Sequence, residues 1–175
     1  MTITDLKEKL LKLNIFLDND YLNSYCELIF NNLETDKEKY KTQKHHVIPI
    51  SYYKNTFHCK TKKEAEEYSA KNNNLIVNLH YCDHVIAHCR LVLCSKENEF
   101  KYKMMCAAYK LLKTSKMDIS EAEREWVIHS EDYQKAYELS KKINSEFNPM
   151  NIEVSRKKHD QTMSRADTRK NYLMV

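Results

Sequence analysis

The sequence of 175 residues contains no glycine, only two prolines and a single tryptophan. Loops that wrap the phosphates of a nucleotide need glycine, because the backbone must approach the phosphate closely, so P-loop and dinucleotide-binding proteins are excluded. Tight two-residue hairpin turns also depend on glycine, and its absence favours a mainly helical fold. Long apolar runs are missing too: no stretch reaches about 18 apolar residues, so we expect no membrane-spanning helix and no membrane partner.

Two further absences concern the cysteines and the N-terminal segment. Six cysteines occur, yet none forms a Cys-x-x-Cys pair, so neither a zinc ribbon nor a thioredoxin-like motif is indicated. Residues 1–14 follow an amphipathic helix pattern and lack the apolar run of a signal peptide. We therefore expect a cytoplasmic protein whose thiols are reduced.

The positive charge is concentrated in two parts of the chain. The net charge is +4, but residues 41–110 contain 12 Lys and Arg against 6 Asp and Glu, and residues 155–175 contain 6 against 2. Such a distribution is typical of a protein that binds a polyanion. A lysine-rich solvated surface without a partner explains the charge equally well at this point.

The apolar residues predict a set of amphipathic helices. Residues 4–14 and 19–32 carry them at spacings of three to four, which is the helical period. Further helices are predicted over 99–114 and over 118–147, the latter as one helix or two. The single tryptophan, Trp126, is expected to anchor this last segment in the core.

Two short apolar segments predict strands. These are "HHVIPI" at 45–50, which stops at Pro49, and "NLIVNL" at 74–79. A short surface helix is predicted between them, and the segment "CDHVIAHCRLVLC" at 82–94 predicts another helix directly after the second strand. The local order is therefore strand, helix, strand, helix.

Four histidines lie in these segments at informative positions. His84 and His88 are four residues apart on the predicted helix, so they face the same way and can bind one metal ion together. A third ligand from the neighbouring strand would complete a site that leaves a position open for water or substrate, which is a catalytic geometry. His45 and His46 are adjacent on the first strand, so their side chains point to opposite faces.

The succession "HHVIP", "NNLIVNL", "DHVIAH" resembles the signature of the HNH (His-Asn-His) endonucleases, and the continuation resembles the phage-type HNH homing endonucleases. The resemblance covers roughly residues 42–148. It implies an α+β fold, mainly helical, with a small two-stranded ββα-metal finger. The expected organisation is an N-terminal helical region (1–40), a nuclease core (41–95), a C-terminal helical region (96–150) and a basic tail (151–175).

The resemblance also implies roles for individual residues. His45 would bind the metal ion together with His84 and His88, and His46 would act as the general base that takes a proton from the attacking water. Mg²⁺ is the expected working ion, while three imidazoles also suit Zn²⁺, Mn²⁺ or Ni²⁺. The expected reaction is the hydrolysis of DNA phosphodiester bonds by a one-metal mechanism.

The asparagine of the motif is expected to orient the ring of His46 through a hydrogen bond. The matching residue is Asn74, but its distance from His84 along the chain is one residue longer than is usual in the family. Either the second strand contains a bulge, or Asn73 takes this role.

DNA is the expected partner, and the oligomeric state is left open. The candidate phosphate-binding residues are Lys44, Lys54, Arg90, Arg156, Lys157 and Lys158. Two alternatives remain at this stage. One is a non-specific HNH toxin or defence nuclease that acts on DNA or RNA and has an immunity protein as partner. The other is a catalytically inactive binding module that keeps the metal for stability.

Overall fold

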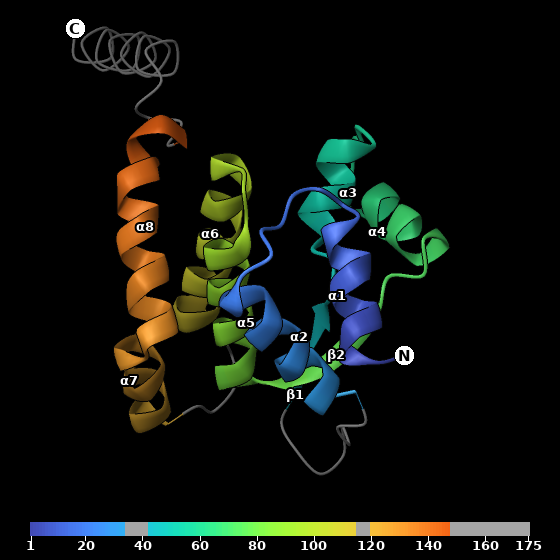
Figure 1. Cartoon of the computed structure of the whole chain (residues 1–175). Coiled ribbons are helices and arrows are strands. Elements are labelled where there is room, and N and C mark those ends of the chain that lie inside the picture. The colour runs from blue at the N-terminus through green and yellow to red at the C-terminus, as the bar shows by residue number, and fades with distance from the viewer. Residues whose placement is uncertain (34–41, 115–119, 148–175) are drawn as a thin grey trace, which may run out of the picture.

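The structure, a computed structural model, describes residues 1–33, 42–114 and 120–147 (Figure 1). These residues form eight α-helices and one two-stranded antiparallel sheet, which confirms the predicted mainly helical α+β class. The predicted tail at 151–175 lies outside the described residues. The elements are α1 (Ile3–Leu11), α2 (Asp20–Asn31), β1 (Thr42–His46), α3 (Ile50–Thr56), α4 (Lys62–Lys71), β2 (Ile76–His80), α5 (Tyr81–Cys94), α6 (Asn98–Thr114), α7 (Glu121–His129) and α8 (Glu131–Phe147).

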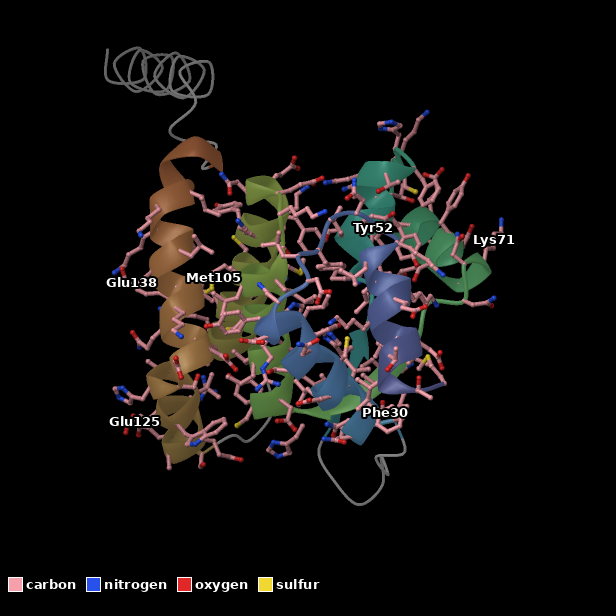
Figure 2. The ribbon with its side chains drawn as sticks, in the orientation of Figure 1. Phe30, Tyr52, Lys71, Met105, Glu125 and Glu138 are labelled. Atoms are coloured by element: carbon pink, nitrogen blue, oxygen red, sulfur yellow. The ribbon has the colours of Figure 1, made fainter. Side chains whose placement is uncertain are left out.

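The helix α5 forms the centre of the fold. It contacts α2, α6, α7, α8 and both strands, and nine of its fourteen residues are buried. A helix surrounded on most sides must be apolar on most sides, which explains why "VIAHCRLVLC" shows no clean polar face. Met105 is a buried residue of α6, and its label in Figure 2 marks the region where α6 and α8 lie side by side.

The N-terminal helices form as the sequence predicts. The helix α1 begins at a capping box between Thr2 and Asp5, and it buries Leu6 and Leu10. The helix α2 begins at Asn19, whose side chain accepts a hydrogen bond from the backbone of Leu22. The helix α2 packs against α5, and Tyr25 of α2 makes hydrogen bonds to His45 of β1 and to the carbonyl of Val47.

The first strand is displaced from its predicted position. It covers Thr42–His46, three residues earlier than expected, and residues 47–49 form a buried loop instead of strand. Val47 still donates a backbone hydrogen bond to Leu75 (2.9 Å), but Pro49 has no N–H with which to continue the ladder. The prediction of a strand over 45–50 is therefore wrong in its bounds, and the helix α3 that follows was not predicted.

The two strands pair in a regular register without a bulge. His45 lies opposite Val77 and His46 lies opposite Ile76. The second strand ends at His80, and α5 begins at the next residue, so strand and helix follow one another without a loop. This direct connection fixes the start of α5 relative to the sheet.

The C-terminal segment forms two helices, α7 and α8, which meet at Ser130. Trp126 was expected in the core, but 59% of its surface is exposed and its neighbour Val127 is fully buried instead. Consecutive residues on a helix point in different directions, so only one of the two can face α5. A single apolar core runs from α1 to α8 through the described residues, and no helix among them is long and apolar enough to cross a membrane.

Candidate metal centre

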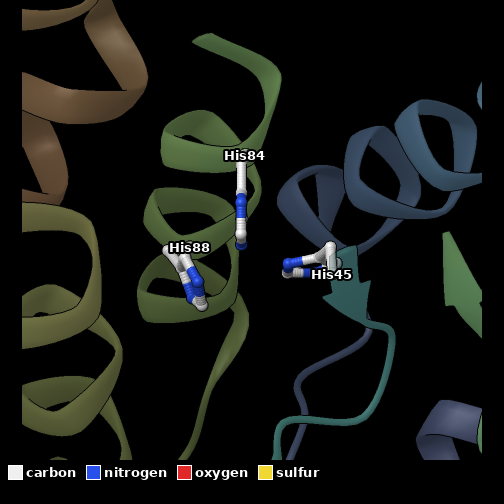
Figure 3. Close-up of side chains that lie close together, drawn as sticks. All are labelled: His45, His84 and His88. Atoms are coloured by element: carbon white, nitrogen blue, oxygen red, sulfur yellow. The ribbon is translucent and has the colours of Figure 1, made fainter. Parts of the chain in front are cut away.

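Three histidines converge between β1 and α5. His45 projects from the strand, and His84 and His88 project from the first two turns of the helix toward it (Figure 3). The ring centroids are 5.0 Å, 5.2 Å and 5.1 Å apart, and one nitrogen of each ring lies within 4.8 Å of the others. Two nitrogens bound to one ion at about 2.1 Å each are at most about 4.2 Å apart, so small side-chain rotations complete the site. The described residues thus include a three-imidazole group that can hold one cation.

Burial keeps these imidazoles neutral, which is the form that binds a metal. Desolvation lowers the pKa of His84 to about 4 and that of His88 to about 3. Burial lowers the pKa of His45 well below 6.5, and the neighbouring histidines add to the effect. Three imidazoles packed against one another without a cation disfavour any positive charge on the rings, so their lone pairs are available at neutral pH.

Hydrogen bonds from other parts of the chain orient two of the rings. The hydroxyl of Tyr25 donates to the carbonyl of Val47 (2.7 Å) and therefore accepts from Nε2–H of His45 (2.9 Å), which leaves Nδ1 of His45 with a lone pair. The side-chain oxygen of Gln43 lies 2.9 Å from Nδ1 of His84, which places the proton there and leaves Nε2 free. Metal-binding histidines usually have such outer partners.

The ring of His88 indicates whether a cation fits between the three histidines. Nδ1 of His88 is buried and has no hydrogen-bond partner among the described residues. A buried polar atom without a partner is uncommon and calls for an explanation. A cation shared with His45 and His84 provides one, so the donor set fits a metal ion.

A cavity of about 270 Å³ adjoins the histidines. Its lining includes Lys44, His46, Ser51, His84, His88 and Lys103. Lys44 and His46 lie on the face of β1 opposite to His45, so His84 and His88 have His45 on one side and the cavity on the other. Any ligand in this cavity therefore reaches both the metal-binding group and His46.

His46 has the properties of a proton acceptor. Desolvation lowers its pKa below 6.5, although Glu66 opposes the effect, so the ring is neutral at neutral pH. Its Nδ1 is buried and has no hydrogen-bond partner within residues 1–33, 42–114 and 120–147. The tandem histidines of the sequence thus have different surroundings, as predicted from their opposite directions on the strand.

The predicted hydrogen bond between Asn74 and His46 is not formed. The amide of Asn74 instead donates to Ile48 O (2.7 Å) and Ser69 Oγ (2.8 Å), and its oxygen accepts from Ile48 N (3.0 Å). Asn74 thus holds the backbone of the loop that follows β1. Any effect of Asn74 on the orientation of His46 is transmitted through this backbone. Asn73 does not replace Asn74: it follows the C-cap of α4 in a left-handed conformation (φ 50°), and its side chain makes no hydrogen bond to His46.

The predicted phosphate-binding residues divide into three groups. Lys44 and Lys54 are exposed, and Lys44 lines the cavity. Arg90 does not belong with them, because its guanidinium is half-buried and binds Asp132 (2.9 Å) and the carbonyl of Ser24 (2.8 Å), joining α5 to α8 and α2. Arg156, Lys157 and Lys158 lie outside the described residues.

Three residues of the site were not identified from the sequence. Gln43 could have been, since it is two residues before His45 and the alternation of a strand places both on one face. Tyr25 and Lys103 carry no such signal, because each reaches the site from a helix that is distant in sequence. Lys103 is held at the cavity by Glu99 and by Asn55 Oδ1 (3.0 Å).

Comparison of the chain with models of known protein families, with curated proteins and with solved structures gives no match.

The metal-free protein is expected to lose stability in mild acid. A histidine whose pKa is lowered by folding stabilises the native state fully above its unfolded pKa of about 6.5. That contribution is lost as the pH falls from about 6.5 toward the folded values of about 4 for His84 and about 3 for His88. Urea unfolding in the presence of a chelator, repeated between neutral pH and mild acid, measures the effect.

The matched variants for this measurement are His84→Gln and His129→Gln, the latter at an exposed position on α7. His84→Gln should flatten the decline of unfolding free energy with acid, whereas His129→Gln should leave it as in the wild type. An equally steep decline in His84→Gln would show that this ring is not buried in its neutral form.

Proposed function

We propose that this chain is a metal-dependent endonuclease of the HNH type that hydrolyses DNA phosphodiester bonds. The observation that carries the proposal is the position of His46 in a cavity whose wall also contains His84 and His88, with His45 completing a three-nitrogen group behind them. The pairing of β1 with β2 and the direct continuation of β2 into α5 agree with the ββα arrangement that the sequence motifs imply, although α3 and α4 are inserted between the two strands.

The histidines and lysines at the cavity would share the tasks of phosphodiester hydrolysis. A divalent cation bound by His45, His84 and His88 would stabilise negative charge on the phosphate and on the leaving oxygen. His46 takes the proton from the attacking water, which its neutral ring can do at neutral pH. Lys44 and Lys103 provide positive charge at two walls of the cavity, where the phosphate oxygens would lie.

Mg²⁺ is the proposed working ion, and Zn²⁺, Mn²⁺ and Ni²⁺ are proposed as ions that the same nitrogens accept. Nitrogen donors favour the transition metals, whereas Mg²⁺ prefers oxygen and keeps several waters. A site in which the protein offers three nitrogens leaves the remaining coordination positions to water and to phosphate oxygens. The substrate would therefore contribute to binding of the ion.

Incubation of supercoiled plasmid with the protein and each of these ions tests the proposal. We expect nicked or linear plasmid with at least one ion and none with a chelator. Binding of DNA by a His46→Ala variant should weaken steeply between 50 and 200 mM salt, because each phosphate contact contributes about −0.9 to the slope of log K against log salt. Intact plasmid with all four ions, or binding that does not respond to salt, would contradict the proposal.

A further inference from the structure

A second group of side chains that could hold a metal ion lies where the end of β2 and the starts of α5 and α7 meet. His80 is the last residue of β2, Cys82 is the second residue of α5, and Glu123 is the third residue of α7. Nε2 of His80 lies 4.0 Å from Oε1 of Glu123, and one donor atom of each of the three residues lies within 4.8 Å of the others. We infer that these residues form a second cation site, separate from the three-histidine group.

The carboxylate of Glu123 is held in place by the start of α7. Its Oε2 accepts hydrogen bonds from the backbone N–H (2.9 Å) and the hydroxyl (2.7 Å) of Ser120 in a capping box. Its Oε1 faces His80. A carboxylate that already has one oxygen fixed loses little conformational freedom when the other oxygen binds an ion.

The thiol of Cys82 is directed to the same place. Its Sγ lies 3.9 Å from the backbone carbonyl of Glu123, so the sulfur already touches α7. Cys82 is fixed by its position on α5, one residue after the helix begins. The three donors therefore come from two rigid helices and the end of a strand, and none depends on a long loop.

The chemistry of the donors selects the type of ion. One imidazole, one sulfur and one carboxylate suit a borderline ion such as Zn²⁺ or Co²⁺, because Mg²⁺ and Ca²⁺ prefer oxygen ligands alone. The thiolate and the carboxylate together balance a divalent charge. The side chains of His80 and Glu123 are 44% and 40% exposed, so solvent can supply the fourth ligand.

An ion at this position would tie α7 to the base of α5. Both helices begin at the same end of the fold and contact each other (Figure 1). Cys82 lies two residues before His84, so the second site would also stiffen the turn of α5 that presents the first site. Its role is structural, and it does not depend on the proposed nuclease activity.

Titration of the full chain with Co²⁺ tests the inference, because only a site with sulfur gives a near-ultraviolet sulfur-to-cobalt charge-transfer band. The wild type should bind two Co²⁺ and show the band. Cys82→Ser should bind one and lose the band, while His45→Ala should lose the other ion and keep the band. Cys106→Ser, at an exposed thiol on α6, should behave as the wild type. No band in the wild type, or a band that persists in Cys82→Ser, would overturn the inference.

Glu123→Gln provides a second variant that keeps the fold. Glutamine also serves as the third residue of a capping box, so the start of α7 is preserved while the charged ligand is removed. The affinity of the ion that gives the band should fall by more than the roughly 10–100-fold that loss of an outer partner causes. An unchanged affinity would show that Glu123 is not a ligand and would overturn the three-residue site. Plasmid cleavage is measured separately, so a failure of either proposal is recognised independently.

Discussion

Replacement of His46 by alanine is expected to lower plasmid cleavage by about a hundred- to ten-thousand-fold, which is the usual contribution of a general base. The ring lines the cavity beside His84 and His88, and desolvation lowers its pKa. Its buried Nδ1 has no partner in the part of the chain that the structure describes. His46 is not one of the three histidines that form the candidate metal centre. The metal content of the variant should therefore equal that of the wild type.

The control for this variant is His129→Ala, which removes an exposed imidazole from the end of α7. Its cleavage rate and metal content should both match the wild type. Cleavage at the wild-type rate by His46→Ala would remove the general-base role. Loss of both cleavage and bound metal would instead place His46 among the ligands, so measurement of metal content decides between these two outcomes.

Asn74 connects this prediction with the loop after β1. Its amide makes three hydrogen bonds that hold the backbone of Ile48 against the side chain of Ser69. Ile48 lies two residues after His46 in the chain. The clamp fixes where β1 ends, and thereby which way His46 points. The predicted contact of Asn74 with the imidazole of His46 is wrong, because the side chain of Asn74 binds the backbone of Ile48 and the hydroxyl of Ser69 instead.

The candidate site was partly predictable because its main determinants are local. The spacing of His84 and His88 fixes their common face on any helix, and the adjacency of His45 and His46 fixes their opposite directions on any strand. The contact of His45 with α5 needs, in addition, the pairing of β1 with β2 and the direct connection from β2 to α5. These relations hold whatever surrounds them, so they could be read from the sequence.

The residues that surround the site could not be predicted, because their contacts depend on how distant helices pack. Tyr25 reaches His45 only because α2 lies against α5, and Arg90 is withdrawn from the surface only because Asp132 on α8 lies beside it. Trp126 shows the same limit. Size and apolar character favour the core, but the packing of α7 buries Val127 and leaves the indole in solvent.

Replacement of His88 by alanine is expected to reduce metal affinity and plasmid cleavage together. The variant leaves two nitrogens, from His45 and His84. It removes the ring whose buried Nδ1 has no hydrogen-bond partner in the described ranges of the chain. The loss should exceed the 10–100-fold that follows removal of an outer partner, because a direct ligand is lost. Calorimetric titration with Zn²⁺ measures it, in a Cys82→Ser background so that the second site does not contribute.

Tyr25→Phe in the same background separates ligation from packing. This variant keeps all three imidazoles but removes the hydroxyl that orients His45, so its metal affinity should fall by only about 10–100-fold. It also leaves the carbonyl of Val47 without its partner, which should lower the free energy of unfolding by about 1–3 kcal/mol. His88→Ala should therefore be the weaker metal binder of the two, whatever the order of their stabilities. Equal metal affinities in the two variants, or a full complement of Zn²⁺ in His88→Ala, would contradict ligation by His88.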